Sequence, residues 1–161
     1  MSYFNDLDYK TWMFNKTAGN NEKLSKKDFE AQYKCLVEEV NEIGEGLETN
    51  NLEEVLDGVV DVLVVATGLA HKLEEIGINV GEAVNRITEN NLSKFPEYTT
   101  KEALETVKLY SNKGESVFTH EILGKLVVKD LNGKIRKPAS FVSVDLSDLV
   151  EGHQLNDAWE L

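Results

Sequence analysis

Apolar residues recur at every third or fourth position through the first two thirds of the chain, which is the spacing of one face of an α-helix. The clearest stripe covers residues 26–48 and follows Ser25 and Asp28, a pair typical of a helix start. Asn51 and Glu54 repeat this signature before the next apolar segment. The pattern predicts helices over about residues 4–14, 26–48, 52–76, 80–92 and 100–110.

The pattern changes after Gly114. Residues 126–128 and Ile135 flank Asn132-Gly133, a dipeptide typical of the two-residue turn of a β-hairpin. Residues 141–144 predict a further short strand. We therefore expect a mainly α fold, in which a helical domain over residues 1–112 is followed by a small β-containing extension over residues 113–161.

The distribution of charge singles out one pair of these helices. The chain has 161 residues, of which 29 are acidic and 17 basic, for a formal net charge of −12. Nine of the acidic residues and none of the basic ones lie within residues 35–71. A solvated helix normally mixes the two signs, because opposite charges one turn apart stabilise each other. The carboxylates of this stretch have no such partner nearby in the sequence.

Composition also excludes several classes of protein. The acidic balance argues against binding to nucleic acid or to an anionic membrane surface. A single cysteine, Cys35, excludes an internal disulfide framework and a cysteine-built zinc site, and it suits a reducing compartment. No apolar run of about 18 residues is present, and the polar N-terminus does not resemble a secretory signal. We therefore expect a cytoplasmic protein.

Residues 55–70 form the most apolar of the predicted helices, and Asp57 and Asp61 are its only charges. Because the two residues are four apart, they lie on one face of the helix. A helix that is apolar all round is buried on most sides, and two buried carboxylates are costly unless something compensates them. The candidates are a cationic side chain from elsewhere, shared protons or a metal ion.

Glu39 and Glu42 share one face of the preceding helix, and the short break between the two helices predicts an antiparallel hairpin. The two glutamates can then face Asp57 and Asp61, with Glu54 one turn further out. Oxygen ligands without histidine or cysteine favour magnesium or manganese over zinc. For the two glutamates taken alone, solvation on an amphipathic helix explains the sequence equally well.

These residues resemble the motifs of the all-α nucleoside triphosphate pyrophosphohydrolase superfamily, which includes MazG-like proteins, dimeric dUTPases and phosphoribosyl-ATP pyrophosphohydrolases. Residues 39–42, Glu-Val-Asn-Glu, match the Glu-x-x-Glu of its first motif. Residues 61–68 are similar to the stretch that carries the aspartate of the second motif, Glu-x-x-Asp. Residues 91–95, Asn-Leu-Ser-Lys-Phe, are similar to an Asn-Met-x-Lys segment of the MazG-like branch. The resemblance covers about residues 10–97, and the tail resembles, more weakly, tails of phage-type members.

One position departs from the family pattern. If Asp61 is the aspartate of the second motif, the glutamate position holds Gly58. Asp57 then takes over as a ligand, or residues 54–57, Glu-Val-Leu-Asp, form the motif instead. Asp57 and Asp61 are the preferred pair, and the choice between Glu54 and Asp57 stays open.

The resemblance implies a helical bundle of the MazG-like type and Mg²⁺-dependent hydrolysis of a nucleoside triphosphate, dUTP or another deoxynucleotide among the candidates, with Mn²⁺ as a substitute metal. It implies that Glu38 orients or deprotonates the attacking water, and that Lys94 with Asn91 binds the triphosphate. Arg86 is expected to assist them. Family members form dimers or tetramers, so we expect a homodimer or a homotetramer.

Two other functions stay open. One is phosphoribosyl-ATP pyrophosphohydrolase-like activity within the same superfamily. The other is a non-enzymatic helical interaction module whose acidic stretch faces a basic partner. Trp12 and Phe14 are candidates for stacking on a base, although packing in the core is the preferred interpretation of both.

Overall fold

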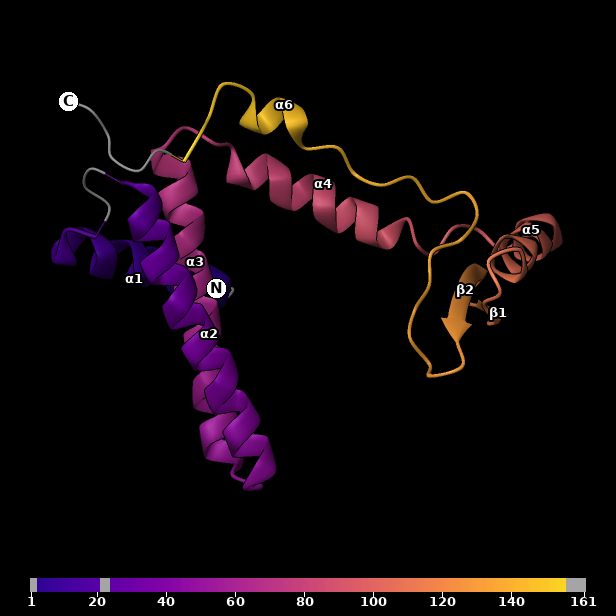
Figure 1. The fold of residues 1–161 in the computed structure, drawn as a ribbon, viewed down its shortest axis with the longest axis horizontal. Helices are drawn as coiled ribbons and strands as arrows, with labels where there is room; N and C mark the ends of the chain where they lie inside the picture. The colour runs from indigo at the N-terminus through magenta and orange to yellow at the C-terminus, as the bar shows by residue number, and fades with distance from the viewer. Residues whose placement is uncertain (1–2, 21–23, 156–161) are drawn as a thin grey trace. The chain divides into compact units, whose positions relative to one another are not determined.

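The computed structural model describes residues 3–20 and 24–155 of the chain (Figure 1). It is mainly helical with one small two-stranded antiparallel sheet, which confirms the predicted fold class. The contacts divide the chain into two compact units, unit 1 with residues 1–80 and 147–161, and unit 2 with residues 81–146. The expected boundary near residue 112 falls inside unit 2. No helix in the described ranges is long and apolar enough to cross a bilayer.

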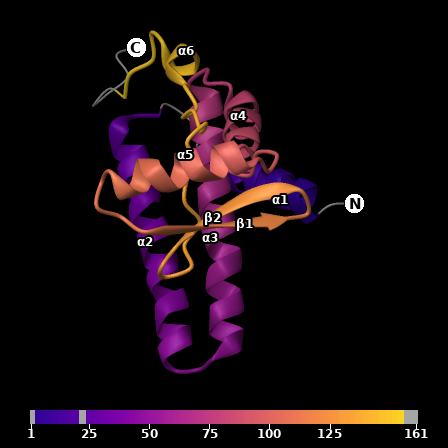
Figure 2. The same cartoon turned by 90° about the vertical axis from the view of Figure 1, so that its right-hand side faces the viewer.

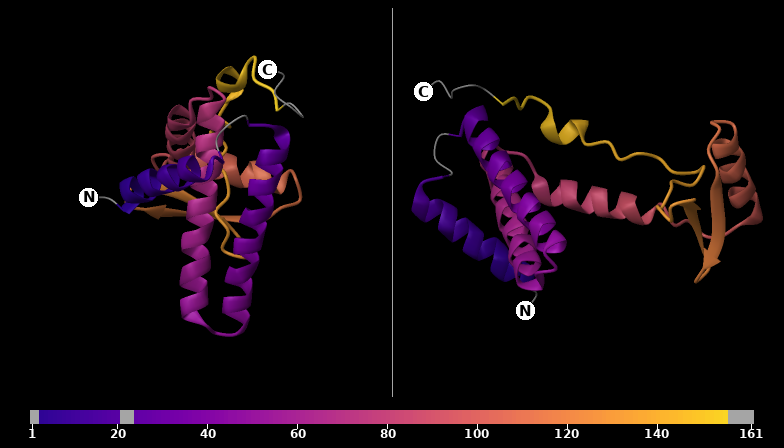
Figure 3. Two further views of the ribbon diagram at one scale, coloured as in Figure 1. Left: turned by 90° about the vertical axis from the view of Figure 1, so that its left-hand side faces the viewer. Right: turned by 60° about the horizontal axis from the view of Figure 1, so that its bottom comes forward.

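Unit 1 is built on an antiparallel pair of long helices (Figures 2 and 3). Ser25 precedes the first of them, and its backbone N–H and hydroxyl donate to Asp28 Oδ2 at 2.7 and 2.6 Å. These two bonds lower the pKa of the Asp28 carboxyl. The second helix begins after Asn51, whose Oδ1 accepts from the Glu54 N–H at 3.4 Å. The helices of unit 1 are α1 (Tyr3–Ala18), α2 (Lys26–Glu48), α3 (Leu52–Glu75) and the short α6 (Ser147–Val150), which the sequence pattern did not predict.

Glycines allow α2 and α3 to approach closely. A Cβ atom added to Gly58 would lie 2.9 Å from Ile43 Cγ1 and 3.2 Å from the Ile43 nitrogen. A Cβ atom added to Gly46 would lie 2.9 Å from the Val55 nitrogen. Real Cβ atoms do not come within 3.0 Å of another heavy atom, so the close approach of the two helices depends on glycine at both contacts.

The contact between α1 and α3 is largely polar. His71 Nε2 lies 2.8 Å from Asp8 Oδ1, and the buried Lys72 donates from Nζ to the Asn20 carbonyl oxygen at 2.5 Å. Burial lowers the pKa of the Lys72 ammonium. Phe14 is 67% exposed, so the expectation that it packs in a core is wrong. Trp12 is half-buried, and the Lys16 ammonium lies 4.6 Å from its ring centroid.

Unit 2 contains α4 (Val80–Leu92), α5 (Thr100–Ser111), β1 (Val117–Ile122) and β2 (Lys125–Asp130). Thr99 caps α5, because its Oγ1 accepts from the Glu102 N–H at 3.1 Å. Alternate residues of β2, Leu126 and Val128, are fully buried against Ala103 of α5. This small apolar cluster fixes the sheet against one face of the helix.

The chain turns back at the predicted Asn132-Gly133, but the main β-hairpin lies elsewhere. β1 and β2 pair across Leu123-Gly124, both of which have positive φ, 52° and 75°. Asn132-Gly133 forms a separate turn that leads to a single bridge between Lys129 and Ile135. Six residue pairs join β1 and β2, whereas only this single bridge forms across Asn132-Gly133.

The strand predicted over residues 141–144 is also wrong. The carbonyl oxygen of Val142 accepts from Asn90 Nδ2 at 2.6 Å instead of from a neighbouring strand. The Val142 side chain is 76% exposed, so the apolar residues of this segment do not form the buried face of a strand. Apolar residues over four positions indicate a strand only where a partner edge is available.

Candidate metal centre

Five acidic residues from α2 and α3 lie close enough together to interact. Burial raises the pKa of the Glu39 carboxyl, and so do the negative charges of four neighbouring carboxyl groups. These belong to Glu42, Asp61, Glu38 and Asp57. Within residues 3–20 and 24–155, none of the five forms an ion pair with a lysine or arginine. The carboxyl groups of the two helices are therefore electrostatic neighbours of Glu39.

The burial of these carboxylates differs from the expectation. Glu39 and Asp61 are half-buried, whereas Asp57 is exposed together with Glu38 and Glu42. The sequence pattern predicted that α3 is covered on most sides. In unit 1, α2 and α1 cover it in part, and apolar residues on its remaining surface stay exposed, among them Leu56 at 64% and Val60 at 45%.

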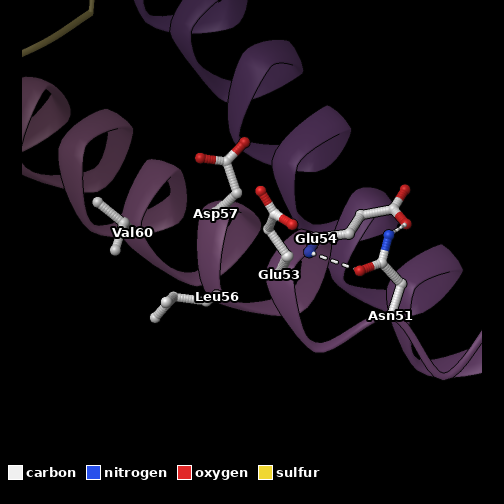
Figure 4. Close-up of a pocket in the computed structure, with 6 residues that line it drawn as sticks. All are labelled: Asn51, Glu53, Glu54, Leu56, Asp57 and Val60. Carbon is white, nitrogen blue, oxygen red and sulfur yellow. Dashed lines mark hydrogen bonds between the residues drawn. The ribbon is translucent and has the colours of Figure 1, made fainter.

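The carboxylate of Glu54 is placed differently from that of Asp57. Its Oε2 accepts from Asn51 Nδ2 at 3.2 Å, so its carboxylate is turned toward the start of α3 (Figure 4). Asp57 is one of the charges that raise the pKa of Glu39. The two residues line one depression of about 670 Å³, together with Asn51, Glu53, Leu56 and Val60. All of its lining residues come from α3 and its cap, so one side of it is open.

At Gly58, where the motif resemblance leads us to expect a glutamate, α2 and α3 are in close contact. Besides its contacts with Ile43, a Cβ atom at this position would lie 3.3 Å from the carbonyl oxygen of Glu39. A glutamate at residue 58 therefore does not fit while α2 and α3 keep this distance. A carboxylate can be carried by the adjacent residue, Asp57, which leaves the helix contact intact.

A divalent cation requires several oxygen ligands directed at one point. In the described part of the chain, no three side chains of histidine, cysteine, aspartate or glutamate are arranged around one point that could hold a metal ion. The carboxylates are neighbours whose oxygens do not converge. The all-oxygen set nevertheless fits Mg²⁺, which keeps several waters and uses only one or two carboxylates per ion.

The residues expected to bind phosphate belong to unit 2. Lys94 Nζ donates to Asn91 Oδ1 at 2.7 Å, so the structure brings this pair together at the end of α4. Arg86 Nε donates to Glu82 Oε1 at 2.7 Å, and its Nη1 donates to the Asp145 carbonyl oxygen at 3.4 Å. The guanidinium of Arg86 therefore already donates hydrogen bonds to acceptors of the protein itself.

Fold and site together define a mainly helical protein with a carboxylate cluster on a helical hairpin. Comparison of the chain with models of protein families, with curated proteins and with solved structures finds no match. The resemblance to the pyrophosphohydrolase superfamily therefore rests on the motif residues of α2 and α3 and on residues 91–95.

Glu39→Gln is expected to raise the melting temperature of the protein at pH 7 in a chelating buffer. The folded-state pKa of Glu39 lies above its ordinary value of 4.5. The folded protein then binds this proton more tightly than the unfolded chain, so stability falls as the pH rises from 4.5 through the raised pKa. Glutamine removes the repelled charge, and its advantage should disappear below about pH 4, where the glutamate is protonated in both states.

Thermal unfolding at pH 3.5 and pH 7 measures this difference. Glu45→Gln is the matched control, because Glu45 lies on the same helix and is exposed. An equal gain at both pH values, or a gain of the same size in the control, would show that Glu39 is not repelled by its neighbours.

Proposed function

We propose that the protein is a Mg²⁺-dependent nucleoside triphosphate pyrophosphohydrolase, which converts a nucleotide such as dUTP or another deoxynucleoside triphosphate to the monophosphate and pyrophosphate. The observation that carries the proposal is the grouping of Glu39 with four other carboxyl groups on the α2–α3 hairpin, without a lysine or arginine paired to any of them among the described residues. Such a cluster costs stability in the absence of cations, and a divalent cation removes this cost while it binds phosphate oxygens. The motif resemblance of α2 and α3 supplies the class of reaction.

The carboxylates take distinct roles in this proposal. Those of Glu39, Glu42, Asp57 and Asp61 hold Mg²⁺, or Mn²⁺ in its place, and Glu54 supports them from the start of α3. The bound metal supplies neutralisation of phosphate charge and a lowered pKa of the attacking water. Glu38, exposed beside Glu39, orients that water or accepts its proton.

Lys94 and Asn91 are the proposed phosphate-binding pair. Their hydrogen bond of 2.7 Å holds the ammonium at the end of α4, where it can act as a point charge toward a phosphate oxygen. Arg86 assists less directly, since Glu82 and the Asp145 carbonyl already accept from its guanidinium. Lys94 and Asn91 are therefore proposed to contribute more to phosphate binding than Arg86 does.

A homodimer or homotetramer also belongs to the proposal. Large apolar side chains on α2 and α3 are exposed, including Val40 at 52%, Leu47 at 67% and Leu52 at 79%. Burial of such side chains against another copy is favourable by about 25 cal/mol per Å² of apolar area. A second copy can also supply the missing wall of the one-sided depression on α3.

A panel of nucleotides with Mg²⁺, assayed for pyrophosphate release, tests the activity. We expect release from at least one deoxynucleoside triphosphate and a rise in melting temperature with Mg²⁺. Release from phosphoribosyl-ATP alone would assign the substrate to the other branch of the superfamily. No release from any nucleotide, together with an unchanged melting temperature, would contradict the proposal and favour the helical interaction module.

A further inference from the structure

β1 is paired along one side and open along the other. Six residue pairs join it to β2. The far side of β2 is covered, because the Leu126 N–H donates to the Pro96 carbonyl oxygen and the Arg136 N–H donates to the Val128 carbonyl oxygen, both at 2.8 Å. Within residues 3–20 and 24–155, residues 117–122 form backbone hydrogen bonds with β2 alone. An open edge of this kind is a template for another strand.

The bonds on the far side of β2 show which groups of β1 are open. The backbone groups of Leu126 and Val128 that form these bonds point away from β1. Leu126 lies opposite Glu121 and Val128 lies opposite Thr119, so these two are non-hydrogen-bonded pairs of the β1–β2 ladder. The N–H and C=O groups of Thr119 and Glu121 therefore point to the open edge, and by alternation so do those of Val117. This is the spacing that an antiparallel partner strand requires.

Apart from the charge of Glu121, β1 has few of the features that normally protect an open edge. Its sequence, Val-Phe-Thr-His-Glu-Ile, contains neither proline nor lysine. Its pairing with β2 is continuous, without a bulge. Phe118 and Ile122 are 51% and 49% exposed on the sheet face opposite α5. Such a strand is more stable when its edge is covered.

The surface of α5 points to a partner on the same side. Glu102 and Thr106 accept backbone N–H bonds from residues 140 and 139, so this flank of α5 faces the segment that follows the outer side of β2. α5 also contacts β1, and Leu104 and Val107, which lie away from Glu102 and Thr106 on the helix, are 65% and 39% exposed. An apolar helix flank and an open strand edge therefore lie side by side in unit 2.

We propose that β1 pairs antiparallel with β1 of a second copy, which gives a four-stranded sheet across two copies. The two-fold axis of this pair passes beside Thr119, so that Thr119 of one copy lies opposite Thr119 of the other. In this register Val117 faces Glu121 of the second copy, and Phe118 faces His120 of the second copy. The three residues with open backbone groups are then all paired, which gives about six hydrogen bonds. The exposed flanks of α5 meet across the same axis.

Other registers fit less well. A register centred on Glu121 sets two glutamates directly opposite, which is destabilising. A register centred on His120 pairs two of the open residues with each other and leaves Val117 opposite the turn residue Leu123. A second copy of β1 thus satisfies all of the open backbone groups in one register, without like charges opposite each other. This interface is separate from the one proposed on α2 and α3, and it does not depend on the hydrolase activity.

Cysteine cross-linking of the full chain tests the register. In a Cys35→Ser background, Thr119→Cys should form a disulfide-linked dimer under mild oxidation, because directly opposed Cα atoms of a hydrogen-bonded pair lie about 5.5 Å apart. His120→Cys is the matched control, since its two copies are diagonal neighbours about 7–8 Å apart. We expect several-fold more dimer from Thr119→Cys. No dimer, equal yields, or a higher yield from His120→Cys would overturn the proposal.

Thr119→Pro provides a second measurement. The N–H at this position faces the open edge, so proline removes no hydrogen bond between β1 and β2. We expect the mass in solution, measured by light scattering, to halve while the circular dichroism spectrum stays unchanged. An unchanged mass with an intact fold would overturn the pairing. Pyrophosphate release is assayed separately, so a failure of the proposed activity is distinguishable from a failure of this interface.

Discussion

Asp61→Asn is expected to lower Mg²⁺-dependent pyrophosphate release by at least about 100-fold while the protein stays folded. Asp61 is half-buried on α3, and its charge is one of those that raise the pKa of Glu39 across the hairpin. Asparagine keeps the size of the side chain but removes the charge with which a carboxylate binds a hard cation. The stabilisation of the variant by Mg²⁺ should fall together with its turnover.

Turnover with the preferred nucleotide and thermal unfolding with and without Mg²⁺ are the two measurements. Glu48→Gln is the matched control, because Glu48 is an exposed carboxylate in the last turn of α2. The control should keep both its turnover and its response to Mg²⁺. Full turnover in Asp61→Asn, or an equal loss in both variants, would remove Asp61 from the proposed metal centre.

Gly58→Ala is expected to destabilise the protein by about 1–3 kcal/mol, since it forces extra volume into a close-packed contact. The added Cβ would lie 2.9 Å from Ile43 Cγ1 and 3.3 Å from the Glu39 carbonyl oxygen, so α2 and α3 must separate. Because Glu39 lies at this contact, the separation should also weaken the response to Mg²⁺. For a chain of this size the melting temperature should fall by about 2–10 °C.

Gly44→Ala is the matched control for this prediction. Gly44 also lies in the helical hairpin, but an added Cβ there meets nothing within 4 Å. Alanine is favoured over glycine inside a helix by about 1 kcal/mol, so this variant should be more stable than the wild type. Thermal unfolding of the two variants in the same buffer gives the comparison. Equal shifts in both variants would show that the two helices are not as close at Gly58 as the structure describes.

Local signals in the sequence predicted the helices well. The bounds of α2 follow from an apolar stripe and from the Ser25–Asp28 pair, and the start of α3 follows from Asn51. These features act within one or two helical turns, so their effect does not depend on the rest of the chain. The β-hairpin is different, since Leu123 adopts a positive φ that a leucine rarely takes. Packing of β2 against α5 determines that turn, and no local rule predicts it.

The carboxylate cluster was predictable only in part. The three- and four-residue spacings place Glu39 and Glu42 on one helix face and Asp57 and Asp61 on another, and a short connection makes the two faces meet. The exposure of Asp57 was not predictable, because it depends on which elements cover α3. The role of Gly58 was visible only as a departure from a motif until the distance to α2 was known.

The sequence by itself thus determined where the helices begin and end, and which acidic residues share a helix face, because both depend on a periodicity of 3.6 residues and on caps. The tertiary structure decided which side of α3 is covered, which strand pairs with β2 and which edge of β1 stays open. These features depend on contacts between residues far apart in the chain. Their free energy comes from the close packing of particular pairs, such as Gly58 with Ile43 and Ala103 with Leu126, and no single segment of the sequence contains both partners.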